Sequence, residues 1–297
     1  MWPRPPETLL LRREEAERLA ARLPPLLVEA ERVAASVVPG LHGRRRSGIG
    51  ETFWQYRLWQ PGDDVRSIDW RASARSDRHR FVREQEWEAA QSVWIWADPS
   101  PSMDYAGPGA PVSKRGRAEL LALALAVLLV RAGERVALLG SGRRPAGGRF
   151  GLERFAADLL LQPRGGGVEP APLPAFARIV LLSDFLFPPA ELEPLLRPAA
   201  AAGVRGSALQ ITDPSEEELP FSGRVLFEDP EDGGPALVEE VEELRGLYLA
   251  LWRAHREEVA GRLARRGVHM GVHRTDRPAV SGLLALWRML APRRAGG

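Results

Sequence analysis

Short apolar runs alternate with helical stretches from residue 92 onward, and this alternation limits the possible fold more than any other feature of the chain. Apolar runs typical of buried strands occupy residues 93–97, 135–139, 178–182, 204–211 and 268–272. Helical patterns occupy residues 117–131, 152–161, 190–202, 238–265 and 280–290. Strands that alternate with helices in this way predict a mostly parallel sheet with helices on both faces. The expected fold class is therefore α/β and Rossmann-like.

The composition excludes several kinds of chemistry. The 297 residues include no cysteine, so disulfides, thiolate nucleophiles and cysteine-ligated zinc sites are absent. The chain is 44% hydrophobic and 27% charged, which is ordinary for a soluble globular protein. Its longest apolar run, residues 120–130, is much shorter than the roughly 20 residues that a membrane-spanning helix needs. No signal peptide is apparent near the N-terminus, and we expect a cytoplasmic protein without a membrane partner.

The chain has three segments of different character. Residues 1–39 have a helical pattern interrupted by a proline pair at 24–25, which predicts two short helices. Residues 40–92 are rich in arginine and tryptophan, and the alternation at 52–58 predicts a strand there. Residues 93–297 carry the α/β pattern. We therefore expect an N-terminal helical segment, a small β-containing region and an α/β domain.

Four oxygen-bearing side chains follow two of the predicted strands. Asp98, Ser100 and Ser102 come directly after the first strand, and Asp184 ends the third. Ligands of open α/β sheets bind at the carboxyl ends of the strands, and hard oxygen donors are those that Mg²⁺ prefers. A plainer interpretation is that Asp98 and the serines form a turn and cap the next helix. The second acidic strand end favours an ion site.

Two sets of residues resemble known families. Asp98-x-Ser100-x-Ser102 resembles the metal-ion-dependent adhesion motif of von Willebrand factor A domains, and Asp184 matches its later aspartate. The block over residues 61–75, which begins Pro-Gly-Asp-Asp, is similar to the signature of the domain of unknown function 58 family. Two further motifs resemble that family, Asp213-Pro214-x-Glu216 and Thr275-Asp276-x-Pro278. The resemblance covers about residues 40 to 290 and implies a von Willebrand A-like fold.

The resemblance also implies a partner and a cofactor. Its members are associated with MoxR-type AAA+ ATPases in the assembly of complexes, so we expect an adaptor that binds this ATPase and a client protein. Asp98, Ser100, Ser102 and Asp184 would hold Mg²⁺. Val168 stands where the resemblance predicts a threonine, and valine has no oxygen to donate. Binding of Mg²⁺ is therefore expected to be weak or absent.

The arginine-rich region has two interpretations. Ten arginines and five acidic residues lie between positions 44 and 83, with Trp54, Tyr56, Trp59 and Trp70 among them. Such a mixture can form a nucleic-acid surface. Alternating signs favour ion pairs within the region instead, so we do not expect nucleic acid as a ligand. Arg44, Arg45 and Arg46 are expected to be solvated and to contact an acidic partner.

The sequence offers little support for catalysis. It has no phosphate-binding Walker loop, no complete dinucleotide fingerprint and no nucleophile elbow. His269 and His273 are four residues apart on a predicted strand, but no third ligand is evident, and surface or interface positions are expected for both. His255 is expected on a solvated helix face. A metal-dependent hydrolase using Asp98 and Asp184 is the main alternative, without an evident general base. We predict a non-enzymatic protein-protein interaction module.

Overall fold

The computed structural model describes residues 25–37, 46–48, 52–60, 68–74, 81–87, 91–165, 173–231 and 233–290. The described residues fall into two compact units. The larger unit contains the helix over residues 25–35 and everything described from residue 91 onward. The smaller unit contains the described residues from 46 to 87.

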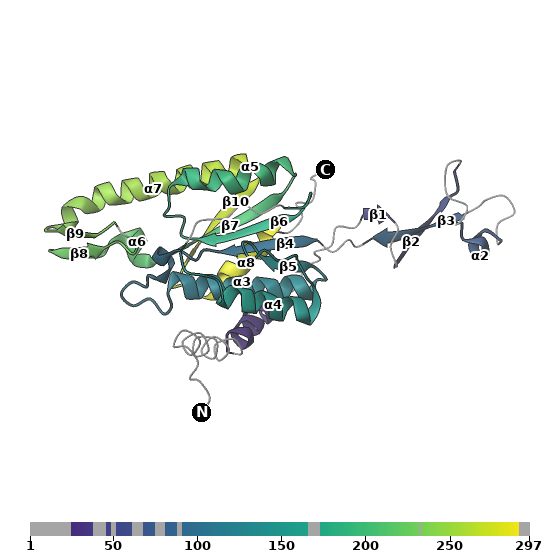
Figure 1. The fold of residues 1–297 in the computed structure, drawn as a ribbon, viewed down its shortest axis with the longest axis horizontal. Coiled ribbons are helices and arrows are strands. Elements are labelled where there is room, and N and C mark those ends of the chain that lie inside the picture. Colours follow the sequence, from purple (N-terminus) through teal and green to yellow (C-terminus); the bar gives the residue numbers. More distant parts are fainter. Residues whose placement is uncertain are drawn as a thin grey trace, which may run out of the picture. The chain divides into compact units, whose positions relative to one another are not determined.

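A five-stranded parallel sheet forms the centre of the larger unit (Figure 1). Its strands are β4 (Ser92–Ala97), β5 (Arg135–Leu138), β6 (Arg178–Ser183), β7 (Arg205–Thr212) and β10 (Val268–Arg274). They lie in the order β10-β7-β6-β4-β5, and every neighbouring pair is parallel. The three inner strands are almost entirely buried, as expected of strands covered on both faces.

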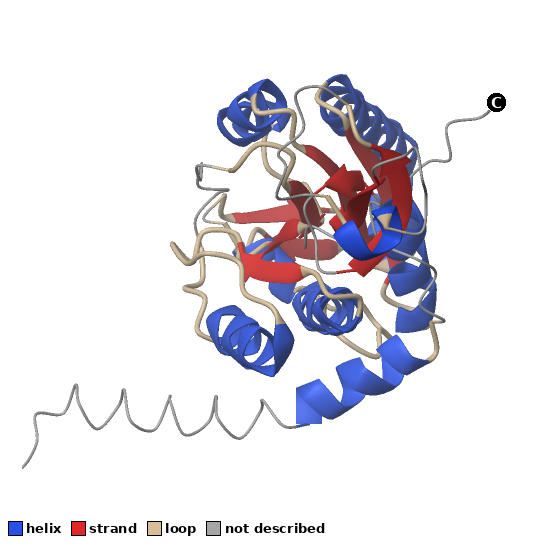
Figure 2. Cartoon of the chain, turned by 90° about the vertical axis from the view of Figure 1, so that its right-hand side faces the viewer, coloured by secondary structure: helices blue, strands red, loops and turns tan. Residues whose placement is uncertain are grey.

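Helices cover both faces of this sheet (Figure 2). They are α3 (Lys114–Arg131), α4 (Gly148–Leu160), α5 (Glu193–Ala201), α7 (Val241–Arg265) and α8 (Ala279–Leu290). Alternate residues of β4 enter two separate cores, because successive side chains of a strand point to opposite faces. Val93 and Ile95 pack with α3, α4, α8 and the helix over 25–35. Trp94 and Trp96 pack with α5 and α7.

The expected α/β class, with a Rossmann-like, von Willebrand A-like arrangement, is confirmed. The predicted strands and long helices are present, with ends shifted by a few residues. Helix α3 begins at Lys114 rather than Arg117, because the Ser113 hydroxyl accepts a hydrogen bond from the Gly116 N–H at 3.1 Å and caps the helix there. No described helix is long and apolar enough to cross a membrane.

Short elements were not predicted. They are the 3₁₀ turns η2 (Pro101–Asp104) and η3 (Pro189–Leu192), the helix α6 (Pro214–Glu218) and the antiparallel hairpin of β8 (Val225–Glu228) and β9 (Pro235–Val238). The residues between Glu228 and Pro235 connect the two strands of this hairpin.

The smaller unit contains a three-stranded antiparallel sheet. Its elements are β1 (Arg46–Gly48), β2 (Thr52–Leu58), α2 (Trp70–Ser73) and β3 (Phe81–Trp87), with strand order β1-β3-β2. The strand predicted over residues 52–58 is confirmed. Several predicted features lie outside the described residues: the Pro-Gly-Asp-Asp segment, Arg44, Arg45 and the helix predicted before the proline pair. Arg46 begins β1.

Candidate functional site

The connections of the sheet diverge between β4 and β6. The chain passes from β4 to β5 on one side, whereas β6 lies on the other side of β4. Asp98 directly follows β4 and Asp184 directly follows β6, and both are buried, with 3% and 0% of their surface exposed. The Asp98 N–H donates to the Leu182 carbonyl at 2.9 Å, so the two strand ends lie side by side. This is the position in an open α/β sheet where ligands bind.

The loop after β4 is held in one conformation by its own hydrogen bonds. Asp98 Oδ1 accepts the Ser100 N–H at 2.8 Å. The hydroxyls of Ser100 and Ser102 lie 3.1 Å apart, and Ser100 makes no side-chain capping bond to η2. Arg115 donates through Nη2 to the carbonyls of Pro99 and Ser100, at 3.0 and 2.9 Å. Turn formation by Asp98 therefore leaves both serine hydroxyls near each other.

Burial and a neighbouring carboxylate perturb Asp98. Its Oδ2 accepts a hydrogen bond from the Ser183 hydroxyl. Burial and the charge of Asp184 raise the pKa of Asp98 to about 6, although the hydrogen bonds from Ser183 and Ser100 oppose the rise. A raised carboxylate pKa means that negative charge is costly here, and a bound cation would relieve that cost.

Lys114 supplies a buried positive charge that the sequence analysis did not assign to the site. Its Nζ donates to Asp184 Oδ2 at 2.8 Å and also to Glu216 Oε1, and its side chain is fully buried. Burial lowers the pKa of Lys114, but the two carboxylates outweigh burial and the net shift is upward. Asp184 is thus already neutralised by an ammonium group. Lys114 is the sole lysine of the chain, which was the available signal.

The backbone turns sharply after Asp184. Phe185 has φ +56°, a left-handed conformation that is uncommon for a residue with a bulky side chain. The Ser183 hydroxyl accepts the Phe185 N–H at 2.7 Å, and Asp184 Oδ1 accepts the Leu186 N–H at 3.1 Å. The Phe185 side chain is fully buried. These contacts hold the second strand end in place.

The next strand end, after β7, is closed by a saturated carboxylate. Asp213 Oδ1 accepts from the Ser215 N–H at 2.9 Å, and Oδ2 accepts from the Gly107 N–H at 2.9 Å and the Thr275 hydroxyl at 3.3 Å. Burial raises the pKa of Asp213, but these bonds outweigh it and the net shift is downward. Glu216 completes a capping box by accepting the Asp213 N–H at 2.8 Å. Asp213, Glu216 and Thr275 therefore stabilise the edge of the site.

The site offers the oxygen ligands that Mg²⁺ prefers, but fewer of them are free and negatively charged than four unpaired ligands would be. Asp98, Ser100 and Ser102 offer hard oxygen atoms within one loop. Asp184 already accepts from Lys114, which leaves the site with less negative charge than four free ligands would give. Among the described residues there is no cluster of three or more histidine or acidic side chains suited to a metal. An ion here would depend on the serine hydroxyls. Val168 lies outside the described residues.

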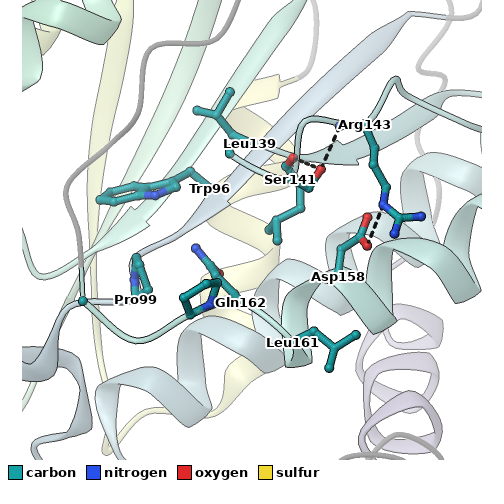
Figure 3. Close-up of a pocket in the computed structure, with 12 residues that line it drawn as sticks. Trp96, Pro99, Leu139, Ser141, Arg143, Asp158, Leu161 and Gln162 are labelled. Carbon is teal, nitrogen blue, oxygen red and sulfur yellow. Dashed lines mark hydrogen bonds and ion pairs between the residues drawn. The ribbon is translucent and has the colours of Figure 1, made fainter. Parts of the chain in front are cut away.

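A cavity of about 420 Å³ opens beside this loop, at the carboxyl ends of β4 and β5 (Figure 3). Trp96, Leu139 and Leu161 contribute apolar surface, and an ion pair of 3.3 Å between Arg143 and Asp158 lies on its wall. Pro99 also lines the cavity, although it belongs to the loop between Asp98 and Ser100. The cavity and the candidate ion site are therefore adjacent.

Comparison with known proteins gives the family. The model of the protein of unknown function DUF58 matches residues 55–258. The chain belongs to the DUF58 family. Uncharacterized proteins of Mycobacterium tuberculosis and Mycobacterium bovis are each 32% identical to this DUF58 protein over 298 residues, covering 94% of this chain and 91% of each relative. A crystal structure of the conserved hypothetical protein BatB from Bacteroides thetaiotaomicron is also similar, at 16% sequence identity and a TM-score of 0.38. The match covers 68% of this chain and 97% of the BatB chain.

The histidines of this DUF58 protein differ from expectation at two positions. His269 is exposed as predicted, but the surface or interface position predicted for His273 is wrong, because its ring is buried against Arg117. Burial and the Arg117 charge lower the pKa of His273 to about 4. His255, predicted on a solvated face, is half-buried, with Nε2 2.6 Å from the Phe185 carbonyl oxygen. The two strand histidines therefore have different environments and make no common site.

Proposed function

We propose that this DUF58 protein is a cytoplasmic, non-enzymatic adaptor that binds a partner protein at the carboxyl ends of β4 and β6. In this proposal it works with a MoxR-type AAA+ ATPase in the assembly or maturation of a complex. One observation carries the proposal. Asp98, Ser100 and Ser102 form a hydrogen-bonded, oxygen-lined loop at the divergence of the sheet, next to a cavity with both apolar and polar lining.

The charge balance of the site favours a bound cation, which could in turn bind an acidic group of a partner. Lys114 neutralises Asp184, so Asp98 is the main uncompensated negative charge at the two strand ends. A Mg²⁺ ion held by Asp98, Ser100 and Ser102 would keep most of its positive charge and supply a coordination position for a partner's Asp or Glu. Asp98 is largely ionised at neutral pH because its pKa is about 6. Arg115 keeps the loop in position through two backbone carbonyls.

The adjacent cavity gives the partner a second contact. Pro99 lies both in the ion loop and on the cavity wall. A partner segment whose carboxylate reaches the ion therefore reaches the cavity within about two residues of extended chain. Trp96, Leu139 and Leu161 would contact an apolar side chain there. Apolar anchors next to a polar contact are typical of protein interfaces.

The hydrogen bonding of the carboxylates supports binding over hydrolysis. Asp184 and Glu216 pair with Lys114, and Asp213 accepts at both oxygens. Asp98 accepts from Ser100 and Ser183. A general base must be able to take a proton from water, and Asp184, Glu216 and Asp213 are committed to structural donors. In this proposal Asp98 holds the ion instead of taking a proton from water.

Affinity purification of the tagged protein from its native cell tests the proposal. The wild type with Mg²⁺ is expected to retain an AAA+ ATPase, whereas Asp98→Ala or a chelator should remove it. Glu153→Ala is the matched control, because Glu153 is an exposed carboxylate of α4 outside the Asp98 loop. Capture that survives Asp98→Ala would exclude the ion-assisted mechanism. Absence of any ATPase from the wild-type sample would reject the proposed partner.

A further inference from the structure

Residues 214–243 are far more acidic than the rest of the chain. They contain eleven acidic residues and one basic residue, Arg224, within a protein of formal net charge +2. These residues form α6, the β8–β9 hairpin and the start of α7. Figure 1 shows them at one end of the larger unit, where the first half of α7 extends past the sheet. Negative charge is thus concentrated in this stretch of the chain.

Leucines are exposed on two elements that this acidic stretch forms or begins, the β8–β9 hairpin and α7. On α7, Leu244, Leu247 and Leu251 are 46%, 61% and 62% exposed, and their spacing of three and four residues puts them on one face of the helix. On the hairpin, Leu226 and Leu237 form a directly opposed cross-strand pair and are 54% and 49% exposed. Clustered apolar side chains of this size at a protein surface indicate an interaction site.

The elements that carry these leucines are held firmly. Arg245 donates to the carbonyls of Leu219 and Phe221, at 3.0 and 2.8 Å. The Tyr248 hydroxyl donates to the Glu216 carbonyl at 2.9 Å. A surface fixed in this way loses little conformational entropy when a partner binds. The exposure of the leucines is therefore a feature of an ordered part of the fold.

Several acidic residues of these elements form no ion pair with a described residue. Glu228, Glu231, Glu240 and Glu243 are exposed, and none of them forms an ion pair with a described residue. Other acids of the region are already committed, since Glu217 pairs with Arg256. The unpaired carboxylates and the leucines together define the acidic leucine surface, which consists of Leu226, Leu237, Leu244, Leu247, Leu251 and these four glutamates.

We propose that the acidic leucine surface docks a basic amphipathic helix of a partner protein. An amphipathic helix inserts apolar side chains at helical spacing, and lysine or arginine beside them would pair with the free glutamates. Nucleic acid and anionic lipid carry negative charge and are repelled by this surface. Two copies of the surface placed face to face would oppose their glutamates, so a second copy of the chain fits poorly. The inference uses none of the residues of the Asp98 loop.

Binding of designed peptides tests the inference directly. The probe is a labelled helical peptide of about 18 residues, or five turns, with leucine at helical spacing and lysine elsewhere. A second peptide has glutamate in place of lysine. By fluorescence anisotropy the full-length protein is expected to bind the lysine peptide alone, and more weakly as salt rises from about 0.05 to 0.5 M. The triple variant Leu244→Gln, Leu247→Gln, Leu251→Gln should raise the Kd at least about tenfold.

Phe150→Gln is the matched control, because Phe150 is 70% exposed elsewhere in the larger unit. It should leave binding unchanged, and glutamine in the triple variant keeps a helix propensity close to that of leucine. Equal binding of both peptides, or an unchanged Kd in the triple variant, overturns the proposal. So does a wild type that sediments as a dimer while the triple variant is monomeric, since the occupant is then a second copy. Loss of ATPase capture in Asp98→Ala leaves this test unaffected.

Discussion

Two buried residues decide the electrostatics of the strand ends. Lys114 is fully buried and its ammonium group lies between Asp184 and Glu216, whereas Asp98 has no cation beside it among the described residues. Removing one partner of a buried ion pair costs more than the pair contributes, because the remaining charge is left unpaired in a medium of low polarity. Substitutions at Lys114 and Asp98 are therefore expected to change the stability of the protein in opposite directions.

Lys114→Met is expected to destabilise the protein by about 3 to 5 kcal/mol, because it leaves two buried carboxylates without a counter-ion. Urea unfolding monitored by circular dichroism measures this change. The defect should shrink at acid pH, where the carboxylates take up protons. Arg149→Met is the control, because Arg149 is exposed and pairs only with Glu153 on the same helix, and it should have no measurable effect. A similarly small effect in Lys114→Met would contradict the account.

Asp98→Asn is expected to stabilise the protein at neutral pH when no metal is present. The folded-state pKa of Asp98 is raised from 3.8 to about 6, so its contribution to stability is fully present below about pH 4 and is lost as the pH rises through 6. The advantage of the asparagine variant should therefore grow between pH 4 and pH 7, by up to about 3 kcal/mol. Urea unfolding of both proteins across this range checks it. A difference that does not change with pH would show that Asp98 titrates normally.

At the scale of elements, the segment after η2 and helix α6 stabilise each other. Gly107 approaches Asp213 so closely that a Cβ atom at this position would lie 2.2 Å from Asp213 Oδ1. Asp213 is the N-cap of α6 and also binds Thr275 after β10. One glycine thus allows the segment after η2 and the ends of β7 and β10 to share a single carboxylate.

Gly107→Ala should destabilise the protein by about 2 kcal/mol, because the methyl group displaces a buried carboxylate from its hydrogen bonds. Thermal unfolding compares it with Gly246→Ala. Gly246 lies inside α7 with open space where a Cβ would be, so alanine there should stabilise the helix by about 0.5 to 1 kcal/mol. Equal effects of the two substitutions would show that the contact between Gly107 and Asp213 does not matter.

The elements also show which parts of the fold the sequence predicts. The buried strands and long helices were predictable because their apolar spacing repeats over many residues, and Asp98 and Asp184 meet because parallel strands end at one edge. The β8–β9 hairpin was missed because its strands are four residues long and half-exposed, so they carry little pattern. Lys114 was missed because its partners are 70 and 102 residues away in the chain. Nothing local marks such a contact.

At the scale of the whole molecule, the larger unit presents two surfaces of different chemistry. The carboxyl ends of β4 and β6 carry an oxygen-lined loop beside a cavity of mixed lining, whereas the acidic leucine surface combines glutamates with exposed leucines. The assignment of Arg44, Arg45 and Arg46 to an acidic partner stays a prediction. These two surfaces would allow the protein to hold two partners together, as the proposed adaptor role requires.

Titration of Mg²⁺ into the purified protein by isothermal titration calorimetry tests the central claim most directly. The wild type at pH 7.5 is predicted to bind one weak ion. The double variant Ser100→Ala, Ser102→Ala should bind none, while its thermal unfolding stays unchanged because the two hydroxyls contact each other. Affinity should also fall below about pH 6 as Asp98 takes up a proton. Absence of binding by the wild type, or equal binding by the double variant, would contradict an ion-assisted docking site at these strand ends.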